Sequence, residues 1–546
     1  MAELTFRVPV ACLVLPLLAS AAERAYVGSK NCFGCHQSIY RSFVKTDMGR
    51  SMRSAAAFSQ TNVPVETSVP LAGSNRLLRV FRDDTGWHQS ESEPNVFNDQ
   101  HKLEYVVGSG ANGLSFVVRR GDYLFQAPLS FYSKPGKWDL SPGYQQADLG
   151  FSRPIAAQCL LCHGGRPQPV KNRNGLYLDP PLEELAIGCE NCHGPGSAHI
   201  ANPRERDSIV NPGKLAPRLA EDICMNCHQT GDARILQPGK DYQDFRPGEP
   251  LIATVAIFKV NPALQQEKDS DLLEHHSAMA MSRCFRESEG KLSCLTCHDP
   301  HVQPLPGDMA STFRSKCMTC HTDRSCHLPL SSRKATTPLD DCIGCHMPKR
   351  NIAVISHSAL TNHRIPARSN EPMPKSTPAE TSDLIVVNQT SGSKAQVPDI
   401  TFLRAYAELA PQFRIFEKRY VTLLEQLAQT QSEDPYVQAA LGHKALAEGK
   451  NREGLAHLEK GLKLGQATVD QDIAQALVNL GRPEEALGHY RAAVEIDPYN
   501  AGLLKTLTLQ LINLHRYAEA QVEMQRYVQT FPEDSFMRNL LAQVTH

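Results

Sequence analysis

The stretch Cys189-Glu-Asn-Cys-His193 is one of seven copies of a pattern in which two cysteines, two residues apart, are followed directly by a histidine. Numbered one to seven along the chain, the motifs are Cys32-Cys35-His36, Cys159-Cys162-His163, Cys189-Cys192-His193, Cys224-Cys227-His228, Cys294-Cys297-His298, Cys317-Cys320-His321 and Cys342-Cys345-His346. Each motif holds two thiols that can form thioethers with haem vinyl groups, and a histidine that can bind the iron. The pattern therefore predicts seven covalent c-type haems and a function in electron transfer.

Paired cysteines also occur in zinc sites, in thioredoxin-like dithiols and in disulfide frameworks. A zinc ribbon needs two cysteine pairs per metal, and no rule places a histidine after each pair. A redox dithiol would occur once, within a βαβ unit that this sequence lacks. Fourteen unprotected thiols would oxidise outside the cytoplasm, whereas thioether bonds protect all of them. Haem attachment is therefore the preferred interpretation of the motifs.

Length and charge limit the remaining possibilities. The chain has 546 residues, which is too long for one compact core, and its formal net charge is −1. A near-neutral chain offers no basic patch for nucleic acid, so we expect no nucleic-acid partner. Because each haem adds two propionates, the assembled protein should be more acidic than the polypeptide alone.

Residues 1–21 resemble an export signal. The run from Val8 to Leu18 is apolar, and Ala19-Ser-Ala21 fits a cleavage site between small residues. Cys12 lies inside the run and should be lost with the signal. We find no later apolar run long enough to span a bilayer, although peripheral membrane association remains open. These features predict a periplasmic, cell-surface or extracellular location.

The predicted haem domain covers residues 22–365, and most of its motifs are crowded into one stretch. Six motifs fall between Cys159 and His346, so the haems should pack closely enough for electrons to move between them. A long insert separates motif one from motif two, with a β-rich part at about residues 60–145. Its candidate strands are Leu77–Phe81, Tyr105–Val107, Ser115–Arg119 and Tyr123–Gln126. The insert either covers the first haem or provides a substrate or partner surface.

The C-terminal part has a different character. Residues 366–400 are rich in Pro, Ser and Thr and predict a linker. Residues 401–546 show the pattern of tetratricopeptide repeats, with Arg482-Pro-Glu-Glu-Ala-Leu487 and, 34 residues after Ala486, Ala520. Residues 402–430 should form a capping helix pair. We therefore predict a mainly α protein: a loop-rich multihaem domain with a small β insert, followed by an α-solenoid. The repeats either dock a redox partner or serve as a scaffold without a ligand.

Histidines outside the motifs are the candidates for the second axial position of each iron. The haem region holds nine of them: His88, His101, His199, His275, His276, His301, His327, His357 and His363. The supply nearly matches a demand of seven, so we predict ligands among His101, His199, His275, His276, His301, His357 and His363, with only one of the adjacent pair His275 and His276 binding. Met48 or Met52 could replace a histidine at the first haem.

Two cysteines, Cys284 and Cys326, lie outside both the motifs and the predicted signal. They could form a disulfide with each other or remain free thiols. No residue is assigned a catalytic role from the sequence.

The stretch from Cys189 to His199, Cys-Glu-Asn-Cys-His-Gly-Pro-Gly-Ser-Ala-His, resembles multihaem cytochromes of the cytochrome c554 type. Other segments that resemble this family are Tyr105-Val-Val-Gly-Ser-Gly110, Cys294-Leu-Thr-Cys-His-Asp-Pro-His301 and Cys342-Ile-Gly-Cys-His-Met-Pro-Lys-Arg350. The resemblance covers about residues 26–365. It implies that His199 is a distal ligand to another haem, and that the protein transfers electrons in the periplasm or at the cell surface. Pentahaem nitrite reductases share the segment Cys-His-Met-Pro, but their catalytic motif ends in Lys instead of His. All seven motifs of this chain end in His.

Three functions remain open from the sequence. The first is an exported heptahaem electron carrier whose repeats dock a partner protein. The second is a multihaem oxidoreductase acting on a small nitrogen or sulfur compound at one five-coordinate haem, which would need an open iron position. The third is an assembly protein in which the repeats matter more than the redox centres.

Overall fold

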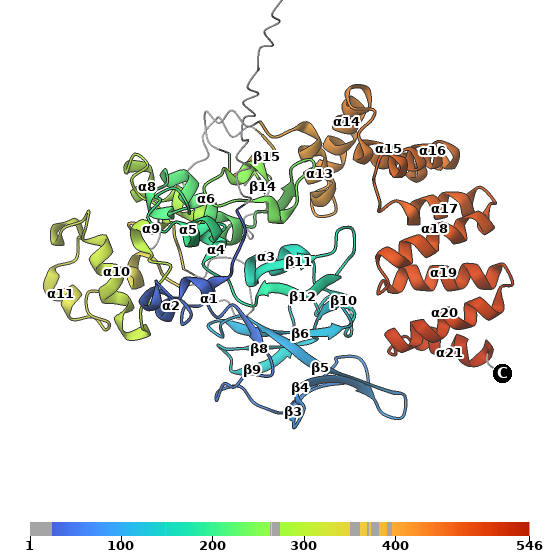
Figure 1. Cartoon of the computed structure of the whole chain (residues 1–546), viewed down its shortest axis with the longest axis horizontal. Coiled ribbons are helices and arrows are strands. Elements are labelled where there is room, and N and C mark those ends of the chain that lie inside the picture. Colours follow the sequence, from blue (N-terminus) through green and yellow to red (C-terminus); the bar gives the residue numbers. More distant parts are fainter. Residues whose placement is uncertain are drawn as a thin grey trace, which may run out of the picture.

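The computed structural model describes residues 24–147, 149–261, 264, 274–349, 361–368, 371–372, 382–389 and 396–544. The predicted signal at 1–21 and much of the predicted linker lie outside these ranges. The described chain forms an antiparallel β sheet, a part with short helices that carries the motifs, and a stack of longer helices (Figure 1).

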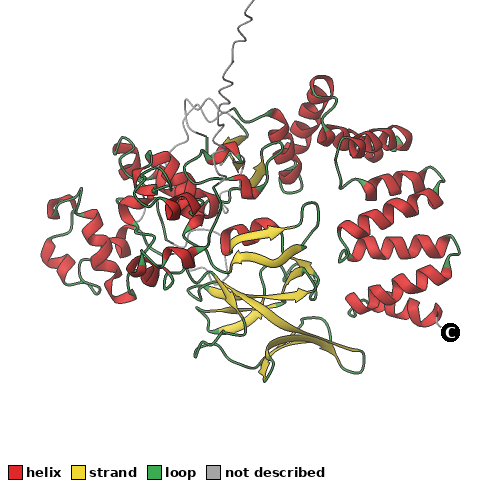
Figure 2. Cartoon of the chain, viewed as in Figure 1, coloured by secondary structure: helices red, strands yellow, loops and turns green. Residues whose placement is uncertain are grey.

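Ten strands form the sheet of the N-terminal part (Figure 2). They are β1 (Met52–Ser54), β2 (Thr67–Pro70), β3 (Leu77–Asp83), β4 (Gly86–Glu93), β5 (Phe97–Val107), β6 (Gly113–Arg120), β7 (Tyr123–Gln126), β8 (Leu129–Tyr132), β9 (Lys137–Leu140) and β10 (Arg153–Pro154). The main path runs β10-β7-β6-β5-β4-β3-β2, and β1, β8 and β9 pair beside it. Each predicted strand of the insert lies within one of these strands.

The sheet is larger than the small insert predicted from the sequence, so the prediction of a mainly α protein is only partly confirmed. The strands of this sheet not predicted are β1, β2, β4, β8, β9 and β10, and the longest of them is β4, whose sequence Gly-Trp-His-Gln-Ser-Glu-Ser-Glu holds one large apolar residue. Its polar side chains are nevertheless buried, because Gln89 pairs with the backbone of Leu129 and Glu91 with Arg76 at 2.7 Å. Strands are usually recognised by alternating apolar and polar residues. Strand β4 lacks this alternation, because its buried polar side chains are stabilised by partners elsewhere in the fold.

The sheet encloses an aromatic core. Its buried members include Trp87, Phe116, Phe125, Phe131 and Trp138. The rings of Phe116 and Trp138 have centroids 5.0 Å apart, in the range where aromatic pairs attract each other. A second apolar cluster joins the sheet to the motif-bearing region, because Tyr105 and Leu124 pack with Leu160 of the helix that carries motif two.

The motifs themselves lie on short helices. The helices that carry motif cysteines are α1 (Ser29–Cys32), α3 (Ala157–His163), α4 (Glu190–His193), α6 (Pro217–His228), α9 (Cys294–Cys297), α10 (Met309–Cys317) and α12 (Cys342–His346). The other helices of this part are α2 (Gln37–Phe43), α5 (Ser197–Ala201), α7 (His275–Met281), α8 (Arg283–Glu287) and α11 (Leu330–Lys334). Cysteines three residues apart on a helical turn lie on the same side of the helix, as attachment of one cofactor requires.

Two small sheets complete the motif-bearing part. Strand β11 (Gly165–Pro169) pairs with β12 (Tyr177–Glu184), and β13 (Ala233–Leu236) pairs with β14 (Val255–Val260). The third strand of the second sheet, β15 (Leu384–Val386), pairs with β14. Part of the predicted linker 366–400 is therefore built into the fold.

The C-terminal part is a stack of antiparallel helices. They are α13 (Asp399–Leu409), α14 (Ile415–Thr430), α15 (Pro435–Ala447), α16 (Asn451–Lys463), α17 (Asp470–Asn479), α18 (Pro483–Ile496), α19 (Ala501–Asn513), α20 (Tyr517–Thr530) and α21 (Ser535–Val544). Ala486 and Ala520, the small residues of the sequence pattern, are fully buried. A Cβ on Gly442 would lie 2.5 Å from Cγ of Leu458, so glycine lets α15 and α16 pack closely.

The helix stack packs against the large sheet. The Tyr499 ring, between α18 and α19, lies against Tyr123 and Phe125 of β7, with centroids 5.0 and 4.6 Å away. The Arg120 guanidinium stands over the same tyrosine ring at 5.7 Å, and Arg173 pairs with Glu495 at 2.7 Å. The repeats are therefore held against the β part, and a truncation at residue 400 would uncover the aromatic residues of β7.

Among the helices that the structure describes, we find none of the length and apolar character needed to span a bilayer.

Candidate haem-binding centre

Two motif histidines each face a histidine from another part of the chain. His36 of motif one lies opposite His199 of α5, with ring centroids 6.3 Å apart and ring planes 21° apart. His193 of motif three lies opposite His301, with centroids 6.0 Å apart and planes 17° apart. The structure thus joins motif one to the helix after motif three, and motif three to the loop after motif five.

Motifs four and five share a cluster of four imidazoles. The ring centroid of His298 is 6.3 Å from that of His363, with planes 33° apart. His228 lies 5.3 Å from His275, and His275 lies 4.9 Å from His363. Two motif histidines and two of the predicted distal ligands therefore meet in one place.

These separations can be compared with what a haem requires. An imidazole nitrogen binds a first-row metal at about 2.0–2.1 Å and lies about 1.1 Å from its ring centroid, so two imidazoles on opposite sides of one iron have centroids about 6.3 Å apart. The pairs His36–His199, His193–His301 and His298–His363 match this spacing. The pair His228–His275 is closer than the spacing requires. The residues present thus fit iron held from both sides at three motifs.

Hydrogen bonds fix which ring nitrogen is available to iron. The Nδ1 atom of His193 donates to the carbonyl oxygen of Val210 at 2.8 Å, and that of His363 to the carbonyl of Thr361 at 2.9 Å. Nδ1 of His301 lies 3.2 Å from Oδ1 of Asp299, and Nδ1 of His199 lies 3.2 Å from the Ser208 hydroxyl. A histidine that donates from one ring nitrogen presents the other to a metal, so each of these rings is oriented to bind through Nε2.

Burial keeps several of these rings in the form that binds iron. It lowers the pKa of His193, His228, His298 and His363 below the ordinary value. For His275, burial and then the neighbouring His228 lower the pKa to about 3. These imidazoles are therefore neutral at neutral pH, and the neutral ring is the metal ligand.

Thiols of different motifs also meet. The pKa of Cys32 is raised, first because its thiol pairs with that of Cys189 and then by burial. The pKa of Cys227 rises through its pairing with Cys162, and that of Cys294 through its pairing with Cys224. Motif one thus touches motif three, motif two touches motif four, and motif four touches motif five.

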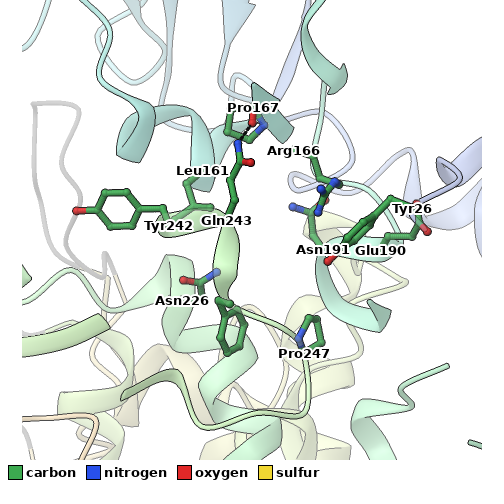
Figure 3. A pocket seen from close by; sticks show the side chains of 11 residues that line it. Tyr26, Leu161, Arg166, Pro167, Glu190, Asn191, Asn226, Tyr242, Gln243 and Pro247 are labelled. Atoms are coloured by element: carbon green, nitrogen blue, oxygen red, sulfur yellow. Dashed lines mark hydrogen bonds between the residues drawn. The ribbon is translucent and has the colours of Figure 1, made fainter. Parts of the chain in front are cut away.

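Motifs two, three and four also surround one small cavity of about 50 Å³ (Figure 3). Its walls include Leu161, Asn191 and Asn226, each the residue directly before the second cysteine of its motif. The cavity is too small for a substrate, because its volume has room for only a few water molecules. The cavity shows that motifs two, three and four lie close together in the fold.

The structure leaves other predicted ligands apart from the motifs or undescribed. His101 lies in β5, where its Nε2 is 2.8 Å from Asp99 and its ring packs on Phe151, so it is not brought to a motif. His276 points to Glu221 at 3.3 Å, whereas its neighbour His275 joins the imidazole cluster. The predicted ligand His357 lies outside the described residues.

The two remaining C-terminal motifs are more exposed. His321 lies on the surface, and Nδ1 of His346 donates to the carbonyl of Pro366 at 2.9 Å. Within the described ranges, neither faces an imidazole ring. Burial raises the pKa of Cys317 to about 11, with the thiols of Cys342 and Cys297 adding to the shift, so motifs five, six and seven also lie near one another.

Two further predictions concern a methionine ligand at the first haem and a disulfide between Cys284 and Cys326. Met52 packs in an apolar cluster with Tyr105 and Leu160, while His199 occupies the position facing His36. Cys284 and Cys326 are both free, so the structure contains no disulfide between them, and Cys284 lies near the motif thiols Cys297 and Cys320.

Comparison with known proteins identifies two segments. Residues 288–325, which hold motifs five and six, match the family model of the doubled CXXCH motif. Residues 477–544 match a tetratricopeptide repeat model. The doubled motif indicates covalent c-type haem, and such repeats commonly mediate protein–protein interaction. No curated protein matches the chain.

Three similar solved structures each cover about a quarter of this chain. A Cut9–Hcn1 hetero-tetramer of APC/C is 13% identical, with a TM-score of 0.24, covering 27% of this chain and 30% of that one. MamA from Desulfovibrio magneticus RS-1 is 18% identical, with a TM-score of 0.24, covering 28% of this chain and 85% of that one. YrrB, described as a repeat protein with an unusual peptide-binding site, is 16% identical, with a TM-score of 0.24, covering 27% and 76%.

Proposed function

We propose that this chain is an exported heptahaem c-type cytochrome of the cytochrome c554-like type, which passes electrons along closely packed haems. The observation that carries the proposal is the facing of imidazoles from separate segments at the spacing of one iron, as in His36–His199 and His193–His301. Rings that merely shared a surface would not be expected to stand nearly parallel at this distance while Nδ1 of His193, His199 and His301 contacts other groups.

The neighbouring motifs support a continuous path. Contacts between cysteine thiols join motifs one and three, two and four, and four and five, and the pKa effects on Cys317 extend the series to motif seven. A bound haem supplies one-electron chemistry at its iron. At motifs one, three and five, the chain's own role would be to hold an imidazole on each side of the iron, which would exclude substrate there.

The location is proposed on chemical grounds. Thioether attachment protects cysteines that would otherwise oxidise outside the cytoplasm, and the apolar run Val8 to Leu18 has the length of a signal segment. A periplasmic or cell-surface protein is the proposal that accounts for both features.

The repeats are proposed to dock a redox partner protein. One side of the stack is already in contact with the rest of the chain: Tyr499 with Phe125 of the large sheet, Glu495 with Arg173 between β11 and β12, and Thr530 with Ser152. On α17, the exposed amides Gln471, Gln475 and Asn479 recur every fourth residue and so share one face of the helix. Amide side chains donate and accept hydrogen bonds without charge, which suits the backbone of a partner polypeptide.

A spin-state measurement tests this proposal against an oxidoreductase. The ferric protein should give predominantly low-spin haem signals, including those from motifs one, three and five, because each has a facing imidazole. Carbon monoxide binding to the reduced protein provides a matched readout, since it needs an open axial position. A high-spin haem that binds carbon monoxide and turns over a small nitrogen or sulfur compound would contradict the electron-carrier proposal and favour the enzyme.

A further inference from the structure

Glu190, inside motif three, has a buried carboxylate that binds two other segments of the chain. Its side chain is only 3% exposed. One oxygen accepts from the backbone nitrogens of Val27 and Gly196 at 3.0 and 2.7 Å, and the other from Val27 and Gly28 at 3.0 and 2.7 Å. Figure 3 shows Glu190 beside Tyr26, the residue before Val27. One carboxylate thus satisfies three backbone donors that come from two distant parts of the sequence.

These two segments lead to the two histidines that face each other. Gly28 directly precedes α1, which leads into motif one and His36. Gly196 directly precedes α5, which carries His199. Glu190 therefore ties the segment before the proximal histidine to the segment before the distal one, while its own motif supplies His193.

A second contact reinforces the junction between motifs one and three. Glu184 accepts from the backbone nitrogen of Ser29 at 2.8 Å and from its hydroxyl at 2.9 Å. The Ser29 hydroxyl oxygen accepts in turn from the backbone nitrogen of Cys189 at 2.8 Å. A Cβ on Gly188 would lie 2.0 Å from Oε2 of Glu184, so glycine is needed where this carboxylate approaches the backbone.

Glu274 repeats the arrangement at another pair of histidines. It is 5% exposed and directly precedes His275. Its carboxylate accepts from the backbone nitrogens of Thr230 and Gly231 at 2.6 and 2.9 Å, and also from the side chains of Thr230 and Gln229. Those residues directly follow His228 of motif four, so a buried glutamate again joins the segments of two neighbouring imidazoles, although these two rings lie closer than one iron requires.

We propose that Glu190 is a positioning residue that holds the distal histidine His199 opposite its proximal partner His36. The inference rests on the proposed haem attachment and adds what sets the geometry of one of the axial pairs. Burying a carboxylate is costly unless its oxygens are hydrogen-bonded, and here the bonds come from the segments that must be aligned.

Glutamine is the informative substitution because it keeps the size of the side chain. Each carboxylate oxygen of Glu190 accepts from two backbone nitrogens. In Glu190→Gln, whichever oxygen becomes an amide nitrogen would present hydrogens to these donors. The buried backbone donors then lose an acceptor, while a side chain of the same size stays in place. The two segments that Glu190 holds should therefore move apart.

The test uses the full-length protein with its haems attached. Glu190→Gln should retain the wild-type haem count but convert the first haem from low to high spin or shift its midpoint potential. The control is Glu91→Gln, because Glu91 is also 3% exposed and binds Arg76 at 2.7 Å, far from any motif in sequence. This control should lower stability without changing any haem signal.

Each outcome decides between the alternatives. If Glu190→Gln behaves like Glu91→Gln, with all spin states and potentials unchanged, the positioning role is wrong. If Glu190→Gln yields too little protein, Glu190→Asp decides, since it keeps both acceptor oxygens but shortens their reach. A change in the first haem then supports the proposal, and an unchanged spectrum and potential overturn it. Wild-type protein without covalent haem would instead contradict the proposed function itself.

Discussion

Replacing both cysteines of motif three, Cys189 and Cys192, with alanine is expected to leave six haems in place of seven and to interrupt the electron path. The Cys189 thiol pairs with Cys32 of motif one, and Cys192 acts on the pKa of Cys227 in motif four. Motif three therefore lies between its neighbours in space. Stopped-flow reduction with a small donor should lose its fastest intramolecular phase, and the haemochrome spectrum should report one haem fewer.

The matched control replaces the two cysteines outside the motifs and the predicted signal. Cys284→Ala with Cys326→Ala removes the same number of thiols, and both residues are unbonded in the structure. This variant should keep seven haems and the wild-type kinetics. Equal loss of haem in the two variants would show that thiols outside the motifs attach the cofactor, and would contradict the motif assignment.

The second large effect is expected from His301→Met. His301 faces His193 with centroids 6.0 Å apart, and Asp299 lies 3.2 Å from its Nδ1. A methionine in this position would replace an imidazole by a thioether, a change that raises the potential of a c-type haem. The midpoint of the third haem should rise by a sizeable part of the roughly 0.8 V range that axial ligands set. A redox titration followed in the visible spectrum measures the shift.

His101→Ala serves as its control. His101 was a candidate ligand by sequence, yet in the fold it binds Asp99 and packs on Phe151 within the large sheet. Its removal should leave every haem potential unchanged. If His101→Ala shifted a potential while His301→Met did not, the pairing of histidines described here would be wrong.

The motifs and the repeats were readable from the sequence because their chemistry and packing depend on local spacing. Cysteines three residues apart lie on one helical turn, and Ala486 and Ala520 lie at equivalent buried positions 34 residues apart. The extent of the sheet was not readable, because β4 buries Gln89 and Glu91 against partners that only the fold provides.

The pairing of histidines depends on long-range contacts, which local spacing in the sequence does not reveal. Glu190 brings His36 and His199 together. Its carboxylate accepts hydrogen bonds from Gly196 and from Val27 and Gly28, and the last two lie more than 160 positions before it in the sequence. Glu190 lies between the two cysteines of motif three, where any residue can stand, so its role could not be predicted from the motif. Three of the predicted distal ligands, His199, His301 and His363, nevertheless face motif histidines at the spacing that one iron requires.

The most direct test of covalent haem at the seven motifs is a pyridine haemochrome count combined with the mass of the intact protein, produced in a host that attaches c-type haem. We predict seven haems per chain, retained after denaturation because thioether bonds hold them. A colourless protein, or one whose mass shows that no porphyrin has been added, would contradict the account.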